Sequence, residues 1–336
     1  MATIADVARR AKVTTATVSN VLTQRVPVSE KTRTRVLQAI EELGYQPNLV
    51  ARGLAQGKTQ TLALIVPTLS NPFFAEVVEE VEHVADQHDY QLLLSMTHNS
   101  MEEGKRHLQR LANRWVDGFI VMGMAADIND VLALKHRGKS VVLSVWNQDP
   151  LALTFPAVDI DFRLAGELGA RYLLECGHRH IALIVEEPVQ LTRRKGYQTA
   201  LLEANLPIIP EYIQAGDSSF ESGYQAMLRL LALPERPTAV LAGNDWMALG
   251  AIEAITRQGW SVPEDLSVVG IDDIVPAAHA HPPLTTISIP KQEMARAATE
   301  LLLRSINETV TPETPLQILV SPHLIVRQSV SRIEHS

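Results

Sequence analysis

The chain has little of what secreted, membrane and disulfide-rich proteins need. It has one cysteine among 336 residues, Cys176, so no intrachain disulfide framework can form. No apolar run approaches the roughly 20 residues that cross a bilayer, and the N-terminus lacks the basic and then apolar pattern of a secretory signal. These absences predict a protein without a membrane span that works in the cytoplasm.

The usual motifs of several enzyme classes are also missing. The sequence has no glycine-rich phosphate loop, no Cys-X-X-Cys pair, no His-Glu-X-X-His and no Gly-X-Ser-X-Gly nucleophile elbow. The 11 histidines are scattered, and His178 and His180 are expected to fasten a turn rather than to bind metal. We therefore expect a binding protein rather than an enzyme, with no cofactor and no metal site.

Charge is divided unevenly along the chain, whose length predicts two or three domains. The net charge of −8 by itself argues against a nucleic-acid-binding protein. However, residues 1–60 hold nine Lys and Arg against four acids, whereas residues 61–336 hold 21 basic and 34 acidic residues. A basic head on an acidic body is typical of a protein that contacts phosphate at one end only. Chance asymmetry over a short window is the alternative.

Three short helices are predicted in residues 1–46. The first begins at a capping box of Thr3 and Asp6 and ends near residue 11, and the second covers residues 15–22 after a tight connection. The tight join favours a helix-turn-helix whose small and polar second helix enters a major groove, and a plain three-helix bundle is the alternative. The third helix, from Ser29 to Gly44, carries apolar residues at helical spacing, namely Val36, Leu37, Ile40 and Leu43.

Four blocks in this region resemble, in order and spacing, the headpiece of the LacI/GalR family. They are Thr3-Ile-Ala-Asp-Val-Ala, Val13-Thr-Thr-Ala-Thr-Val-Ser-Asn, Val28-Ser-Glu-Lys-Thr-Arg and Leu43-Gly-Tyr-Gln-Pro-Asn. The resemblance implies double-stranded operator DNA as a partner. It also implies base reading by the second helix, where Asn can pair with adenine and small side chains can meet a thymine methyl. The expected DNA contacts on that helix are Thr15, Ala16, Thr17 and Asn20.

Residues 47–60 resemble the family's hinge helix and its linker. A helix of under three turns with Gly53 in its middle is marginal alone and is expected to fold mainly on DNA. By resemblance, Leu54 wedges between base pairs from the minor groove, and Asn48 and Arg52 also contact DNA. Burial of Leu54 against the core is the alternative.

Alternating strands and helices follow from residue 61 to the C-terminus. Alternation of this kind predicts an α/β core of two doubly wound parallel sheets, with ligands bound beyond the carboxyl ends of the strands. The predicted strands are residues 62–66, 91–95, 118–122, 141–145, 180–185, 239–242 and 267–271. The predicted helices are residues 75–88, 105–115, 164–175, 197–204, 224–231 and 247–257. Residues 159–161 are interpreted as one of the loops at a strand end.

This region is similar to the LacI/GalR core, which resembles periplasmic sugar-binding proteins. The matching blocks begin at Asn71, Gly177, Arg193, Glu221, Asn244, Val268 and Pro282. The resemblance implies two subdomains, of about residues 61–160 with 290–320 and of residues 161–289 with 321–336. The expected effector-binding residues are Phe73, Phe74, Trp146, Asp161, Arg193, Asn244, Trp246 and Asp272.

Two departures prevent the ligand from being copied from a relative. The loop where many relatives carry an acid has Trp146, and a position that is often aromatic is Ser218, although Phe220 follows it closely. For Asp159 and Asp272, capping of a neighbouring helix is the alternative role. Arg194 and Lys195 are interpreted as a solvated charge run.

Together these features predict a DNA-binding transcriptional regulator controlled by a small effector. Repression is adopted because it is the family's commonest mode, and a homodimer is expected because it would match a pseudopalindromic operator. The expected effector is a sugar or sugar derivative, and a purine or other metabolite acting as corepressor is the alternative. An enzyme or transport-type module with a vestigial head is a third reading, which the basic headpiece and hinge disfavour.

Overall fold

The structure is a computed structural model, and it describes residues 2–23, 26–45, 58–113, 116–123, 125–145, 154–307 and 317–333. The chain forms two compact units, Met1–Thr59 and Gln60–Ser336. No helix within the described ranges is both long enough and apolar enough to span a bilayer.

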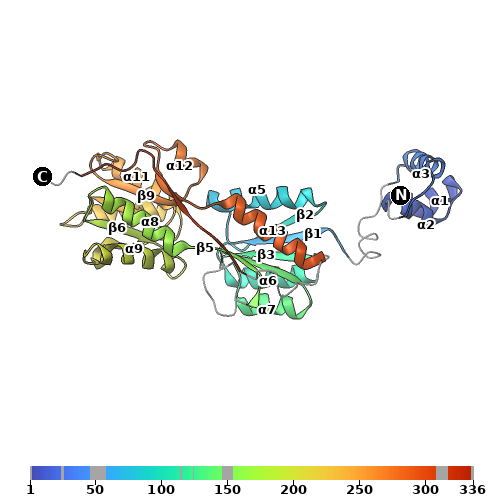
Figure 1. Cartoon of the computed structure of the whole chain (residues 1–336), viewed down its shortest axis with the longest axis horizontal. Coiled ribbons are helices and arrows are strands. Elements are labelled where there is room, and N and C mark those ends of the chain that lie inside the picture. Colours follow the sequence, from blue (N-terminus) through green and yellow to red (C-terminus); the bar gives the residue numbers. More distant parts are fainter. Residues whose placement is uncertain are drawn as a thin grey trace. The chain divides into compact units, whose positions relative to one another are not determined.

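The first unit contains the three predicted helices, α1 (Ile4–Ala11), α2 (Thr15–Thr23) and α3 (Glu30–Leu43) (Figure 1). The predicted capping box is confirmed, because the Asp6 amide donates to Thr3 Oγ1 at 3.3 Å and the Thr3 amide donates to Asp6 Oδ2 at 2.9 Å. Gly44 ends α3 in the left-handed region at φ +56°, where glycine is favoured.

One face of each helix closes the small core of this unit. Val7, Val18 and Val36 are fully buried there. The apolar side predicted for α3 was partly wrong, because Leu37 is 47% exposed and Leu43 is 36% exposed. At about 100° per residue, Val36 and the buried Ala39 share the inner face, and Leu37 is rotated away from it.

The described residues of the second unit form the two predicted sheets, each of which contains six strands. Their spatial orders are β11-β5-β4-β3-β1-β2 and β12-β10-β9-β8-β6-β7, and all neighbours are parallel except β12, which is antiparallel to β10. The first sheet comprises β1 (Thr61–Val66), β2 (Gln91–Met96), β3 (Gly118–Met122), β4 (Ser140–Ser144), β5 (Ala157–Ile160) and β11 (Gln317–Val320). The second comprises β6 (Ile181–Val185), β7 (Ile213–Ala215), β8 (Ala239–Ala242), β9 (Ser267–Asp272), β10 (Thr285–Ser288) and β12 (His323–Ile325).

Helices cover both faces of each sheet. In Figure 1, α5 and α13 lie on one side of the first sheet, and α6 and α7 lie on the other. Side chains of β1 alternate accordingly, since Leu62 and Leu64 belong to the apolar cluster of α5, whereas Ala63 and Ile65 belong to that of α6 and α7. We call each sheet with its covering helices a lobe. The helices of the first lobe are α5 (Pro72–Gln87), α6 (Met101–Ala112), α7 (Ile128–His136) and α13 (Lys291–Asn307). Those of the second lobe are α8 (Phe162–Glu175), α9 (Leu191–Glu203), α10 (Phe220–Leu231), α11 (Asp245–Arg257) and α12 (Val275–His279), with a 3-10 turn at Pro210–Tyr212.

The described chain passes between the two sheets after β5, after β10 and after β11. Asp161 therefore lies at the first passage, and Lys291 follows the second. Because parallel strands end at the same edge of a sheet, the loops after β6, β8 and β9 meet at one edge of the second lobe.

All seven predicted strands are present, and five shorter ones were not predicted. The interpretation of residues 159–161 as a loop is corrected, since Asp159 lies within β5 and pairs in register with Leu319 of β11. The five missed strands have three or four residues each, namely β5, β7, β10, β11 and β12. Segments this short show too few alternations to reveal a period.

Candidate DNA-binding face and candidate effector site

The N-terminal half of α2 presents a small, exposed surface. Thr14 caps the helix, because its Oγ1 accepts from the Thr17 amide at 3.1 Å. Thr15 and Ala16 are exposed at the first turn, and Thr17 is half-buried with its hydroxyl 2.9 Å from that of Thr14. A face without bulky or acidic side chains suits close approach to base edges.

Asn20 lies one turn further along α2, half-buried at the rim of a shallow hollow. The hollow measures about 200 Å³ and is lined by Val21, Val26, Pro27 and Arg33 besides Asn20 and Val28. Val26 is 51% exposed, so this rim offers apolar contact beside the polar face. Sequence reasoning had assigned no role to the rim, because its members come from two separate segments.

Four expected site residues lie outside the described residues. They are Asn48, Arg52 and Leu54 of the expected hinge and Trp146 of the expected effector site. Their roles stay predictions.

Arg193, on the first turn of α9, is a buried cation at the strand-end edge of the second lobe. Its side chain is 10% exposed, its Nη1 donates to the Gly243 carbonyl at 2.6 Å, and its guanidinium lies 4.1 Å from the centre of the Phe162 ring. Its Nε is buried without a hydrogen-bond partner. Burial lowers the pKa of Arg193, while the nearby acids Asp272 and Glu186 act in the opposite direction. The buried Nε–H of the arginine is therefore unused.

Asp272 ends β9 and faces this arginine. Its Oδ1 lies 3.8 Å from Arg193 Nη2, too far for a hydrogen bond, and that oxygen is buried without a partner. Burial raises the pKa of Asp272 to about 7, although the charge of Arg193 lowers it. Its backbone has φ +122°, a region that L-residues rarely adopt. Capping was the alternative role for Asp272, and no cap bond of its carboxylate occurs in the described residues.

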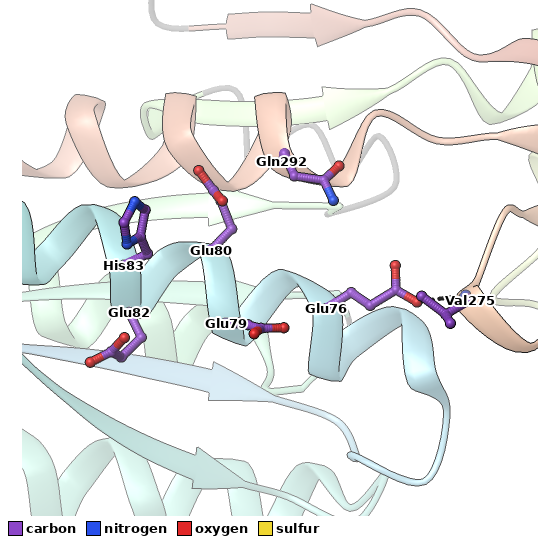
Figure 2. Close-up of a pocket in the computed structure, with 7 residues that line it drawn as sticks. All are labelled: Glu76, Glu79, Glu80, Glu82, His83, Val275 and Gln292. Atoms are coloured by element: carbon purple, nitrogen blue, oxygen red, sulfur yellow. Dashed lines mark hydrogen bonds between the residues drawn. The ribbon is translucent and has the colours of Figure 1, made fainter.

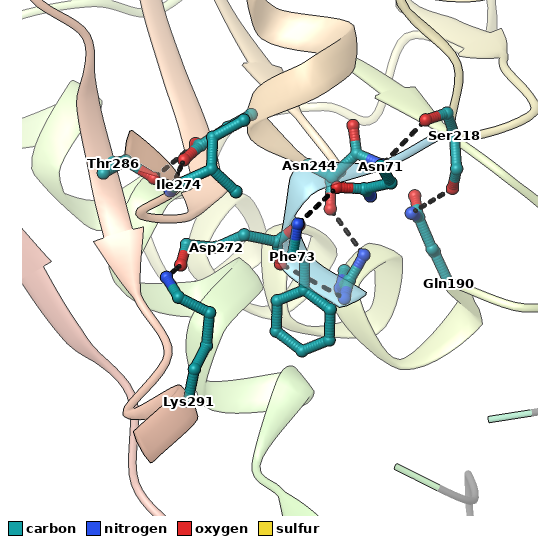
Figure 3. A network of polar contacts seen from close by, with 12 residues as sticks. Asn71, Phe73, Gln190, Ser218, Asn244, Asp272, Ile274, Thr286 and Lys291 are labelled. Atoms are coloured by element: carbon teal, nitrogen blue, oxygen red, sulfur yellow. Dashed lines mark hydrogen bonds and ion pairs between the residues drawn. The ribbon is translucent and has the colours of Figure 1, made fainter. Parts of the chain in front are cut away.

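A second polar network joins the ends of β6 and β8. Gln190 Nε2 donates to Ser218 Oγ at 3.0 Å, and Ser218 Oγ donates to Glu186 Oε2 at 2.5 Å. Asn244 Nδ2 donates to the Ser218 carbonyl at 3.3 Å (Figure 3). Gln190, Ser218 and Glu186 were missed as network members because each is an ordinary polar loop residue until the fold brings the loops together.

The side chains of Asn244 and its neighbour Asp245 both form hydrogen bonds that stabilise the local fold. Asn244 Oδ1 caps α11 by accepting from the Met247 amide at 2.8 Å. Asp245 is fully buried, accepting from Thr286 Oγ1 at 2.5 Å and from the Ile274 amide at 2.9 Å. Burial raises the pKa of Asp245 to about 6. Asp245 thus fastens α11 to the loop that follows Asp272.

Two aromatic pairs belong to the expected site. Phe73 is buried at the start of α5, and its ring centre lies 5.3 Å from that of Phe74 in an edge-to-face arrangement. Figure 3 shows Phe73 in the same view as Asn244 and Asp272. Trp246 is half-buried and packs edge-to-face on Phe220 at 5.6 Å.

The remaining expected residue, Asp161, accepts from the Leu164 amide at 2.8 Å and caps α8. The interpretation of Arg194 and Lys195 as a solvated charge run is corrected for Arg194, which is half-buried and donates to Glu187, whereas Lys195 is exposed. The interpretation of His178 is confirmed. His178 is buried with Nδ1 2.9 Å from Thr238 Oγ1 and Nε2 3.2 Å from the Ser331 carbonyl, so it fastens a turn. No cluster of three metal-ligating side chains occurs among the described residues.

A hollow of about 460 Å³ lies elsewhere on the second unit (Figure 2). Its lining is acidic and comes mainly from α5, with Glu76, Glu79, Glu80, Glu82, His83, Val275 and Gln292. It lacks the buried, unpartnered polar atoms of Arg193 and Asp272. We therefore place the candidate effector site at those two residues rather than in this hollow.

Fold and site together define a class: a helix-turn-helix unit followed by an α/β core with buried, unpartnered polar groups at its strand ends. Residues 3–48 match the family model described as bacterial regulatory proteins, lacI family, and residues 170–330 match that of the periplasmic binding protein-like domain. The chain belongs to the LacI family of DNA-binding bacterial regulatory proteins, which are not enzymes.

Individual relatives match over nearly the whole chain. The chain is 40% identical to the HTH-type transcriptional repressor PurR of Haemophilus influenzae (strain PittEE), over 99% of this chain and all of that protein. Among solved structures, the lac repressor dimer bound to operator and the anti-inducer ONPF has a TM-score of 0.86 at 29% identity, covering 98% of this chain and 99% of that one. The cellobiose complex of the transcriptional regulator CelR has a TM-score of 0.73 at 33% identity, covering 98% and 100%.

Proposed function

We propose that this protein is a transcriptional repressor that binds a pseudopalindromic operator as a homodimer. The exposed first turn of α2, with Thr15 and Ala16, and the basic balance of residues 1–60 support the DNA contact. Residues 47–60 would supply the hinge, with Asn48, Arg52 and Leu54 on the minor groove. The full-length similarity to PurR repressors and the lac repressor dimer on operator support repression and two-fold assembly.

The operator part is tested by selecting binding sites from a random duplex library with the purified full-length protein. The expected result is an enriched two-fold pseudopalindrome. Thr15→Ala together with Asn20→Ala should relax the sequence preference, since those side chains would read bases. Lys195→Met, on the exposed side of α9, is the control that should leave the preference unchanged. Enrichment of no common sequence would contradict the proposal.

Operator affinity is proposed to depend on a small effector that contacts both Arg193 and Asp272. The observation that carries this proposal is the pair of buried, unpartnered atoms, Arg193 Nε and Asp272 Oδ1. A buried donor or acceptor that makes no hydrogen bond costs about 1–3 kcal/mol. A ligand that both accepts from Arg193 and donates to Asp272 is therefore favoured there. Binding would bias the arrangement of the two lobes and, through it, the hinge.

The proposed effector is a planar nitrogen heterocycle of the purine type. Such a ring presents N–H donors to Asp272, carbonyl or ring-nitrogen acceptors to Arg193, and flat faces to the phenylalanines at the start of α5. Similarity to the PurR repressors supports this class. A carbohydrate, expected from the sequence, is the second candidate, and the observation that favours it is the cellobiose complex of CelR.

A thermal-shift screen with free purine bases, nucleosides, glucose and cellobiose tests the effector part. A saturable rise in Tm with a purine base is expected, abolished in Arg193→Met and kept in Lys195→Met. A rise with cellobiose alone would establish the carbohydrate reading. If no compound shifts the Tm, or if Arg193→Met responds like the wild type, the site assignment is wrong.

A further inference from the structure

Lys291 is a buried lysine that neither the family resemblance nor the expected site includes. It is the first residue of α13, a helix that packs against α5 in the first lobe, and its side chain is only 5% exposed. Burying an ammonium without partners is costly, so its contacts indicate what it is there to hold.

Two of its side-chain partners lie on the loop that carries Asp272. Its Nζ donates to the Asp272 carbonyl at 2.6 Å (Figure 3). It also donates to the Asp273 carbonyl at 2.6 Å. These carbonyls belong to the second lobe, whereas α13 packs on the first. One ammonium group therefore joins the two lobes directly beside the candidate effector site.

The backbone that Lys291 holds is strained. Asp272 has φ +122° and Asp273 has φ +55°, two successive residues at angles that cost free energy. Arg327 reaches the same turn, because its Nη2 lies 2.6 Å from Asp273 Oδ1. A strained backbone of this kind persists only where its surroundings hold it in place. Here Lys291 donates to the two carbonyls of the turn, and Arg327 donates to the Asp273 carboxylate.

We call the contacts of Lys291 and Arg327 with the Asp272–Asp273 turn the clamp. Glu76 connects this clamp to α5. Its Oε2 lies 3.2 Å from Lys291 Nζ, and its Oε1 accepts from the Val275 amide at 3.0 Å (Figure 2). Glu76 is one turn along α5 from Phe73. The same carboxylate thus touches both lobes and the helix that carries the aromatic part of the expected site.

We propose that Lys291, with Glu76, is a positioning residue for the effector site: it holds the strained Asp272–Asp273 turn so that the Asp272 carboxylate meets the ligand only when the lobes are joined. This inference rests on the proposed effector function. Lys291 does not touch the ligand, and it acts through the backbone of Asp272. Effector binding and the junction of the lobes are thereby linked by one ion pair, that of Lys291 and Glu76.

The test uses hydrogen exchange of the effector-free full chain, together with binding of the purine bases. In Lys291→Met, exchange should rise in peptides covering residues 270–276 and 72–80, and affinity for the purine base found with the wild type should fall by about tenfold or more, as for loss of a charge-assisted hydrogen bond. Arg296→Met is the matched control. Arg296 pairs with Glu80 at 2.6 Å between the same two helices but within one lobe, so neither readout should change.

Replacing Lys291 leaves the carboxylate of Glu76 without its ion-pair partner, and that alone can impair folding. The double variant Lys291→Met with Glu76→Gln removes this charge and should show the same two effects. Unchanged exchange at residues 270–276 would overturn the clamp, and faster exchange there with undiminished affinity would overturn its link to the effector. Faster exchange throughout both lobes of the double variant would show a purely structural role. If the wild type binds no compound, the effector proposal fails, while exchange still decides on the clamp.

Discussion

At the scale of single residues, Arg193 and Asp272 are opposite charges, and burial disfavours the charged form of each. Desolvation lowers the pKa of Arg193 and raises that of Asp272 to about 7, and the 3.8 Å gap between them leaves both incompletely satisfied. A ligand that bridges the gap would stabilise both charged forms. The pair is therefore tuned to respond to a neutral ligand with a donor and an acceptor.

The pKa of Asp272 predicts a pH dependence of effector binding. Because a raised pKa keeps the group protonated until about pH 7, the carboxylate that accepts from the ligand becomes available only as pH rises through that value. Affinity should increase by about tenfold between roughly pH 6 and 8, measured by isothermal titration of the purine base. Asp272→Asn, which cannot ionise, should bind weakly at every pH. A flat profile in the wild type would contradict the role of the carboxylate.

At the scale of elements, two glycines let α8 and α9 approach backbone to backbone. A Cβ on Gly166 would lie 2.0 Å from the Arg193 carbonyl oxygen, and one on Gly196 would lie 1.9 Å from the Arg163 carbonyl oxygen. Both contacts are with main-chain atoms, which cannot swing aside. The position of Arg193 thus depends on a helix contact as well as on its own side-chain bonds.

Gly166→Ala is therefore expected to push α9 outward and to carry Arg193 with it. Overpacking of this kind costs about 1–3 kcal/mol, which urea unfolding would measure, and effector affinity should fall together with stability. Lys195→Ala, on the exposed side of α9, is the control and should stay within about 0.5 kcal/mol. A stable Gly166→Ala variant with normal affinity would show that the helices can move apart without disturbing the site.

Strands that are continuous apolar runs were predictable from the sequence. Strands that form only because a neighbouring strand pairs with them were not. The buried strands β1, β3 and β6 are continuous apolar runs, which the sequence shows directly. By contrast, β10 reads Thr-Thr-Ile-Ser and becomes a strand because it pairs with β9. The site divides in the same way. Arg193, Asn244 and Asp272 followed from resemblance, whereas Lys291 stands in an ordinary polar helix start, and its partner Glu76 is distant in the chain.

At the scale of the whole molecule, charge separates the two tasks. Residues 1–60 carry the basic excess and the remaining residues the acidic excess, so DNA attraction should come from the first unit alone. The effector groups Arg193 and Asp272 lie in the second unit. A regulator divided in this way should lose one function without the other, and the proposed connection between them is the hinge of residues 47–60.

The two functions should therefore separate in reciprocal variants. Leu54→Ala removes the expected minor-groove wedge, so operator affinity should fall by about 100-fold, in line with a few kcal/mol of lost wedge contact, while the thermal shift with effector stays normal. Arg193→Met should bind effector-free operator as the wild type does, yet its operator affinity should no longer change when effector is added. Both quantities are measured by fluorescence anisotropy of labelled operator at fixed salt. If Leu54→Ala bound operator normally, the hinge assignment would fail. If Arg193→Met still responded, the effector would act from a different site.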